Sequence, residues 1–231
     1  MRAWTCAATS DAVPSPKTVE RATKVTVFLA CLAPLALLLA DLFGGRLGPD
    51  QIRATELKTG QAGLILLIIT LAVTPLRRFT GWNRLGGYRR MLGLFAFFYI
   101  CLHFLDWLGV DQFFALKYIG KDIVKRPYIT VGFASFLLMV PLAITSSSRM
   151  VRRLGKRWAQ LHALVYVAAL GGIIHFVWEV KADLGEPTAY GFIVVALLLL
   201  RFVPREAFGL VRGVAPARRL PGAEPAAKEA A

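Results

Sequence analysis

Six apolar runs separated by short charged segments constrain this chain more than any other feature of its sequence. The runs cover residues 25–43, 61–76, 91–108, 128–145, 158–178 and 188–203. An α-helix needs about 20 mostly apolar residues to cross the roughly 30 Å hydrocarbon core of a bilayer. Hydrophobic residues make up 56% of the 231 residues. The sequence therefore predicts an all-α membrane protein, a bundle of six transmembrane helices.

The runs also divide the chain into three parts. We expect an N-terminal tail over residues 1–23, a transmembrane domain over residues 24–204 and a C-terminal tail over residues 205–231, whose low-complexity end PARRLPGAEPAAKEAA predicts disorder. The first run resembles the core of a signal peptide, but no small-x-small cleavage site follows it, so we interpret it as a helix. Pro34 and Pro141 fall inside predicted helices, whereas Pro127 suits a first helical turn.

Basic loops predict the orientation of the bundle. The loop after the second run contains five arginines and no acid, and the loop after the fourth run also has five basic residues without a carboxylate. Positively charged loops face the cytoplasm, so both termini are predicted to be cytoplasmic. Topology and contact with anionic lipid headgroups explain the net charge of +14. No motif for binding nucleic acid is present.

All three histidines of the chain, His103, His162 and His175, fall within predicted membrane helices. An ionisable side chain in a membrane span is costly, so a functional role is the first hypothesis. A hydrogen bond that only joins neighbouring helices is the alternative for each histidine taken alone.

His103 and His175 are predicted to lie at the same depth, near the outer ends of two helices that run in the same direction. Two neutral imidazoles on facing helices can bind a haem iron from both sides, and we predict that these two are the axial ligands. His162 lies about 20 Å from His175 along the helix, near the inner surface. Arg89 or Arg90 stands where a second inner histidine would be needed, so the sequence predicts one complete haem site.

Small and aromatic residues accompany the predicted haem site. Gly171 and Gly172 offer room for a flat macrocycle, although close helix packing explains such glycines equally well. Aromatic side chains are candidates for the walls of the site or for ordinary packing: Phe97, Phe98, Tyr99, Phe104, Phe176 and Trp178.

Four stretches carry a resemblance to a known family. They are TGQAGLILLIITLAVTPLRRFTG, RRMLGLFAFFYICLHFLDWL, DIVKRPYITVGFASFLLMVPLAITSS and RRLGKRWAQLHALVYVAALGGIIHFVWEVK, which together span residues 59–181. The chain resembles the MsrQ family, the haem-binding membrane subunits of the bacterial periplasmic methionine sulfoxide reductase system. That family belongs to the ferric-reductase-like transmembrane group.

The resemblance implies a multi-pass protein of the bacterial inner membrane that passes electrons outward to a periplasmic, molybdopterin-containing MsrP-type catalytic subunit. That partner repairs methionine sulfoxide in oxidised proteins, and a cytoplasmic flavin reductase or the quinone pool supplies the electrons. The implied cofactors are haem b and FMN, and the histidines of the family match His103, His162 and His175. Inner arginines are candidates for a flavin phosphate, although each also suits the positive-inside pattern: Arg77, Arg78, Arg89 and Arg90.

The chain lacks the parts that a complete reductase needs. No GxGxxG motif, P-loop or nucleophile paired with a base is present, so we expect an electron relay with no sulfoxide-reducing site of its own. Another b-type cytochrome, a ferric reductase or a non-redox transporter is an alternative. Asp106 and Glu179 lie at helix ends rather than at mid-membrane, which weakens the transporter alternative.

Overall fold

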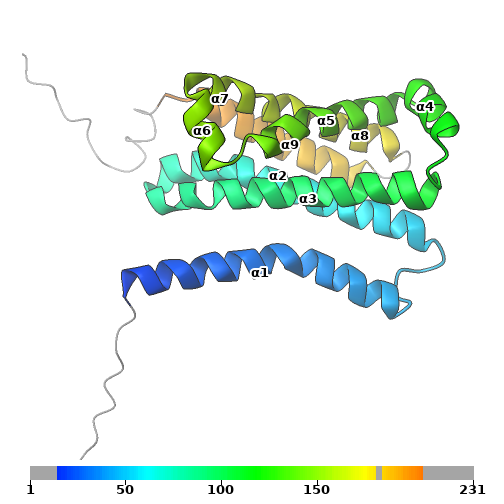
Figure 1. Cartoon of the computed structure of the whole chain (residues 1–231), viewed down its shortest axis with the longest axis horizontal. Helices are drawn as coiled ribbons and strands as arrows, with labels where there is room; N and C mark the ends of the chain where they lie inside the picture. The colour runs from blue at the N-terminus through cyan, green and yellow to red at the C-terminus, as the bar shows by residue number, and fades with distance from the viewer. Residues whose placement is uncertain (1–14, 181–183, 205–231) are drawn as a thin grey trace, which may run out of the picture.

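The computed structural model describes residues 15–180 and 184–204, and within these ranges the chain forms helices and no strand (Figure 1). Six helical segments are long and apolar enough to cross a membrane, as predicted. They comprise α1 (Pro16–Phe43), α2 (Gln51–Thr80), α3 (Arg89–Asp106), α5 (Pro127–Ile144), α7 with α8 (Lys156–His162 and Leu164–Glu179) and α9 (Gly185–Phe202). Residues 1–14 and 205–231 lie outside the described residues, and the remaining part of the predicted N-terminal tail, residues 15–23, includes the cap and first turns of α1. The domain boundaries remain a prediction.

Short elements connect the long helices. The 3₁₀-helix η1 (Asn83–Gly87) lies between α2 and α3, and α6 (Ser148–Leu154) lies between α5 and α7. A π-helical turn, η2 (Trp107–Asp111), extends α3 and leads into α4 (Leu116–Lys125). Because α4 and α6 lie at opposite ends of the bundle, we call these ends the α4 end and the α6 end (Figure 1).

Two helices extend beyond their predicted apolar runs because polar turns with strong caps precede the runs. The Asp50 side chain accepts a hydrogen bond from the amide of Arg53 and starts α2 ten residues before the predicted Gln61. Ser15 caps α1 in the same way, through the amide of Thr18, and Pro16 follows it at the first turn. A search for apolar runs misses such turns, because they form helix without being apolar.

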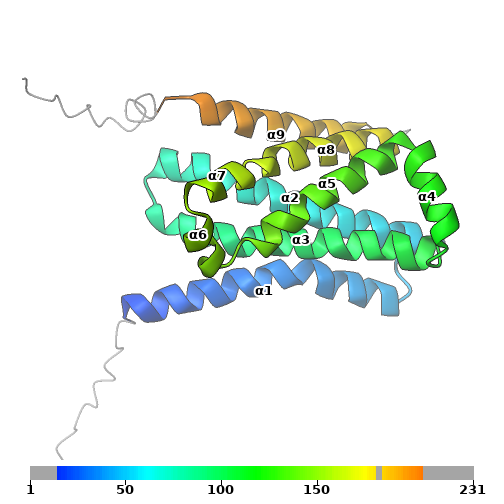
Figure 2. The ribbon, with the colours of Figure 1, turned by 45° about the horizontal axis from the view of Figure 1, so that its top comes forward.

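The helices pack as two hairpins with two flanking helices. The α2–α3 hairpin lies beside the α5–α8 hairpin, α9 covers α8 and α2, and α1 lies along the opposite side against α2 and α3 (Figure 2). Small side chains allow close approach at the centre, where Ala96, Ala169 and Val194 are fully buried. Large apolar side chains on the outside, such as Phe192 and Leu199, are exposed as contact with lipid tails requires.

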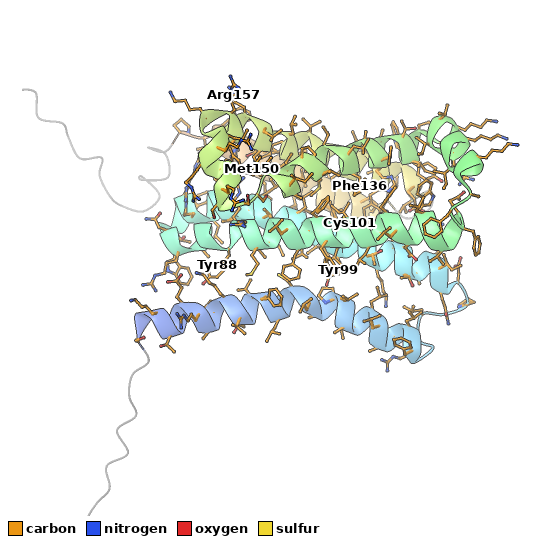
Figure 3. All side chains as sticks on the ribbon, viewed as in Figure 1. Tyr88, Tyr99, Cys101, Phe136, Met150 and Arg157 are labelled. Atoms are coloured by element: carbon orange, nitrogen blue, oxygen red, sulfur yellow. The ribbon has the colours of Figure 1, made fainter. Side chains whose placement is uncertain are left out.

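Tyr99 attaches α1 to the rest of the bundle. Its side chain extends from α3 toward α1 (Figure 3), where the hydroxyl donates to the carbonyl of Cys31 (2.8 Å) and accepts from the amide of Leu35 (3.0 Å). These two backbone groups would pair with each other in a regular α-helix. The hydroxyl therefore enters the helical ladder next to Pro34, which lies inside α1 as predicted.

Candidate functional site

His103 and His175 meet at the α4 end of the bundle. His103 lies in the last turn of α3 and His175 lies near the end of α8. Their ring centroids are 6.0 Å apart and the ring planes are inclined by 72°. Both residues are half-buried. The structure thus brings together the two histidines that the sequence assigned to one depth.

A backbone carbonyl holds each of the two imidazoles. The Nδ1 of His103 is 2.9 Å from the carbonyl of Glu56 on α2, and the Nδ1 of His175 is 2.8 Å from the carbonyl of Tyr128 on α5. A carbonyl oxygen only accepts hydrogen bonds, so each Nδ1 carries the proton. In a neutral imidazole with this tautomer the Nε2 lone pair is available for a metal ion.

A glycine lies against each imidazole, four residues after the carbonyl that holds it. A Cβ atom on Gly60 would lie 3.1 Å from the Nδ1 of His103, and a Cβ atom on Gly132 would lie 2.6 Å from the Nδ1 of His175. The second distance is shorter than any tolerable contact, so a side chain at position 132 would displace the ring. The two glycines let α2 and α5 approach the histidines closely enough for the carbonyls to reach them.

The two hairpins therefore repeat one local design. Glu56 and His103 are 47 residues apart in the sequence, and so are Tyr128 and His175. In each hairpin the first helix supplies the carbonyl and the glycine, and the second helix supplies the histidine. Sequence reasoning identified the histidines and missed the carbonyls and glycines, although the equal spacing of the Gly–His pairs was a detectable signal.

A cavity of about 310 Å³ separates the two hairpins, and both histidines line it. This volume lies at the lower end of the range of roughly 300–1,000 Å³ that small-molecule and cofactor sites occupy. Its lining includes the apolar side chains of Leu67, Ile100 and Met139, and Phe136 of α5 also lines it on the side of α3 (Figure 3). Phe104 stacks on Phe136 at 4.7 Å.

The predicted small residues divide between the two interpretations. Gly172 lines the cavity, and a Cβ atom there would meet nothing within 4 Å, so this glycine leaves open space in the wall. Gly171 instead packs against the Ser135 side chain of α5, so this glycine serves close helix packing.

The predicted aromatic residues divide in the same way. Phe104 and Phe176 line the cavity, whereas Tyr99 is directed toward α1. Phe97 stacks on Phe136 at 6.1 Å without lining the cavity. Phe98 and Trp178 are exposed, as side chains that face lipid would be.

His162 lies far from this cavity, toward the α6 end, where α7 ends. Its Nε2 is 3.0 Å from the Thr145 hydroxyl, and its ring stacks on Trp158 with centroids 4.0 Å apart. The indole of Trp158 in turn donates to the carbonyl of Thr145 (3.0 Å). The counterpart of His162 in the other hairpin is Arg90, whose guanidinium donates to the Ser148 hydroxyl (3.1 Å).

The geometry at the α4 end fits the two axial ligands of a haem iron. Two imidazoles that share one metal ion, each with a metal–nitrogen bond of about 2 Å, have ring centres roughly 6 Å apart. His103 and His175 have this separation, and an apolar cavity of cofactor size adjoins them. Among the described residues, no group of three or more His, Cys, Asp or Glu side chains gathers as a protein-ligated metal ion would require.

Comparison with known proteins relates the chain to one group of membrane proteins. Residues 59–173 match the family model described as "Ferric reductase like transmembrane component". The "Protein-methionine-sulfoxide reductase heme-binding subunit MsrQ" of Rhodospirillum rubrum is 53% identical over 80% of this chain and 89% of its own length. The proteins of the same name from Herminiimonas arsenicoxydans and Caulobacter vibrioides are 50% and 45% identical, over 77% and 76% of this chain and 83% and 84% of their own lengths. No solved structure matches the chain.

Proposed function

The chain belongs to the MsrQ family of heme-binding subunits of protein-methionine-sulfoxide reductases, and on that premise we propose that it is a membrane electron carrier with one haem b between His103 and His175. The observation that carries this proposal is the pair of carbonyl-anchored imidazoles, 6.0 Å apart, beside an apolar cavity. A haem bound there would supply a one-electron redox centre.

Backbone carbonyls and apolar side chains around the site would orient the two ligands and shield the metal position. The Glu56 and Tyr128 carbonyls fix the tautomer and direction of both imidazoles before a haem arrives, which lowers the entropic cost of ligation. The apolar wall keeps water away from the metal position and influences the reduction potential through its low polarity. Phe104 of α3 and Phe136 of α5 are part of this lining.

The acceptor is proposed to be a periplasmic, molybdopterin-dependent methionine sulfoxide reductase of the MsrP type. The names of the relatives support a partner that reduces methionine sulfoxide. The histidine pair lies at the α4 end, away from the two basic loops, so the positive-inside rule supports a haem near the outer surface of the bacterial inner membrane. Electrons would then enter from a cytoplasmic flavin reductase or from quinone and leave toward the periplasm.

A second cofactor at the α6 end, FMN or another haem, is a separate proposal that rests on the resemblance and on His162. Arginines surround that end and suit a phosphate group: Arg77, Arg78, Arg89 and Arg90. The bond between His162 and Thr145 favours the alternative of a packing role. An inner-cofactor content that stays unchanged in His162→Ala would contradict a cofactor role.

The test of the main proposal is a dithionite-reduced minus oxidised absorption spectrum of detergent-purified protein. We expect low-spin b-type bands in the wild type and their loss, or conversion to high spin, in His103→Ala and in His175→Ala. The bands of the outer pair should persist in His162→Ala, which tests the inner cofactor separately. Methionine sulfoxide should reoxidise the reduced protein only when the sulfoxide reductase is added. A folded wild type without haem bands would overturn the proposal and favour the transporter or packing alternatives.

A further inference from the structure

The cavity between the hairpins has a charged mouth at the α4 end. Arg53 lies in the first turn of α2 and Arg126 lies directly before α5, and both line the cavity. They are partly exposed, with 67% and 51% of their side chains accessible. Glu56, Gln61 and Glu179 also line the cavity, and the rest of its lining is mainly apolar apart from the histidines, Tyr128 and Ser135.

The two arginines lie near the same place in the repeated design, one residue out of register with each other. Arg53 precedes Glu56, whose carbonyl holds His103, by three residues, and Arg126 precedes Tyr128, whose carbonyl holds His175, by two residues. Each hairpin therefore brings one guanidinium group to the mouth of the cavity. The same hairpin also supplies the carbonyl that holds one of the two histidines. Both arginines also lie at helix N-termini, where the peptide dipoles favour anions.

Each of these arginines has a carboxylate among its partners. Arg53 donates from Nη2 to Oε1 of Glu179 (2.8 Å), which joins α2 to α8 across the mouth. Arg126 pairs with Asp122 at 3.5 Å and donates to the Tyr128 hydroxyl at 3.3 Å. These exposed ion pairs are weak and exchangeable, because water screens them and long side chains lose entropy in forming them.

A haem has an apolar macrocycle with two carboxylate groups on one edge. If those carboxylates pointed inward they would leave water for an apolar wall, which is strongly unfavourable without a paired cation. If they pointed to the mouth, each would meet a guanidinium, and arginine binds carboxylates through paired, charge-assisted hydrogen bonds. The two guanidinium groups lie on the same side of the apolar wall as Glu56 and Glu179, so the cations of the mouth, and not its net charge, favour the outward orientation.

We propose that Arg53 and Arg126 bind the two propionate carboxylates of the haem, one each, at the α4 end. This inference rests on the proposed function, because it assumes the same haem between His103 and His175. Arg53 either gives up its ion pair with Glu179 for one with a propionate or binds both carboxylates at once. Arg126 does the same with Asp122 and the second propionate. The propionate edge then faces the mouth, on the side where the proposed acceptor binds.

The experiment compares haem with haem dimethyl ester, in which both carboxylates are esterified. Purified apoprotein is loaded with each, and the rate of loss to an excess of a haem-scavenging apoprotein is measured. Wild type should lose the ester faster than haem by about fivefold to tenfold, since two partly exposed arginine–carboxylate pairs contribute up to about 1 kcal/mol each. Arg53→Gln and Arg126→Gln should each lose haem about threefold to fivefold faster than wild type, as expected for the loss of one partly exposed pair.

A second readout separates this role from general damage to the fold. In both variants the low-spin spectrum should persist, because His103 and His175 are untouched, and the reduction potential should fall as a positive charge is removed. The arginine variants should lose the dimethyl ester at nearly the same rate as wild type does, because the ester has no free carboxylate for an arginine to bind. Arg46→Gln is the matched control: Arg46 also pairs with a carboxylate, Asp41, at the same end, but does not line the cavity.

The outcomes distinguish the two proposals. If wild type binds haem with the spectrum of paired histidines but retains haem and its ester equally, the carboxylate site is wrong and the electron-carrier function stands. The carboxylate site is also wrong, and the electron-carrier function stands, if Arg53→Gln and Arg126→Gln lose haem no faster than Arg46→Gln does. If wild type takes up no haem, the proposed function fails together with this inference.

Discussion

The imidazole of His175 is fixed from two directions. The Tyr128 carbonyl accepts its Nδ1 proton at 2.8 Å, and the backbone of Gly132 lies so close that a methyl group there would overlap the ring. His103 has the same surroundings, with more space at Gly60. A glycine is required at both positions for room rather than for an unusual backbone conformation, because both lie within regular helices.

Gly132→Ala should remove His175 from its position. The added methyl group would lie 2.6 Å from Nδ1, so the ring must turn and give up the Tyr128 carbonyl. Losing a buried hydrogen bond costs about 1–3 kcal/mol, and we expect haem retention to fall roughly tenfold or more. The haem-to-protein ratio and the reduced minus oxidised spectrum measure this.

Alanine variants of three glycines should differ in haem retention according to the space at each position, which tests whether close contact positions the imidazoles. Gly60→Ala should weaken haem retention less than Gly132→Ala, because its closest contact would be 3.1 Å. Gly120→Ala on α4 should have no effect, since a Cβ atom there meets nothing within 4 Å. Wild-type haem content in Gly132→Ala would show that the close contact does not position the ring.

At the scale of elements, α1 stands apart from the other helices. It lies on one side of the bundle, and its contacts include the edge-to-face pair of Phe28 with Phe95 and the insertion of the Tyr99 hydroxyl. Tyr99 is only 1% exposed and does not line the cavity. Its role is therefore the attachment of α1, independent of the histidine site.

Tyr99→Phe should loosen α1 without affecting the haem. The carbonyl of Cys31 and the amide of Leu35 would lose their partner, at a cost of about 1–3 kcal/mol in stability. Hydrogen exchange at the Leu35 amide should accelerate and the thermal midpoint should fall, while the absorption spectrum stays unchanged. Tyr190→Phe is the control, because Tyr190 is also partly buried but lies on α9, where its ring stacks on Phe176 rather than on α1. Unaltered exchange at Leu35 in Tyr99→Phe would refute the attachment role.

At the scale of the whole molecule, the two ends of the bundle differ in their charge. Two loops, each with five basic residues and no acid, lie at the α6 end. The first residues of α1 and the last residues of α9 lie at the same end (Figure 1). The histidine pair and the mouth of the cavity lie at the α4 end. The positive-inside rule predicts that the α6 end, with the start of α1 and the end of α9, faces the cytoplasm (Figure 1).

Labelling of single cysteines tests this orientation. In a chain whose native cysteines are replaced by alanine, Lys121→Cys on α4 should react with a membrane-impermeant maleimide in intact spheroplasts. Arg152→Cys on α6 should react only after permeabilisation. Both positions are exposed, so access to the reagent differs only by side. The reverse pattern would place the haem site on the cytoplasmic side and exclude a periplasmic acceptor.

The sequence by itself determined the six helices and the pairing of His103 with His175. Apolar length is dictated by the thickness of the bilayer, and the cost of a histidine in lipid makes each one conspicuous. Helix ends were less predictable: α2 began at Gln51 rather than Gln61 because a cap and a polar turn extended it. Those features depend on local hydrogen bonds that hydropathy does not measure.

Only the tertiary structure decided what surrounds the pair. The carbonyls of Glu56 and Tyr128 carry no sequence signal, because every residue has a carbonyl and only folding selects which one reaches an imidazole. Gly171 and Gly172 are adjacent in sequence, yet one packs against α5 and the other leaves space in the cavity wall. Burial in lipid sets the helices one at a time, whereas the site depends on the approach of helices far apart in the sequence.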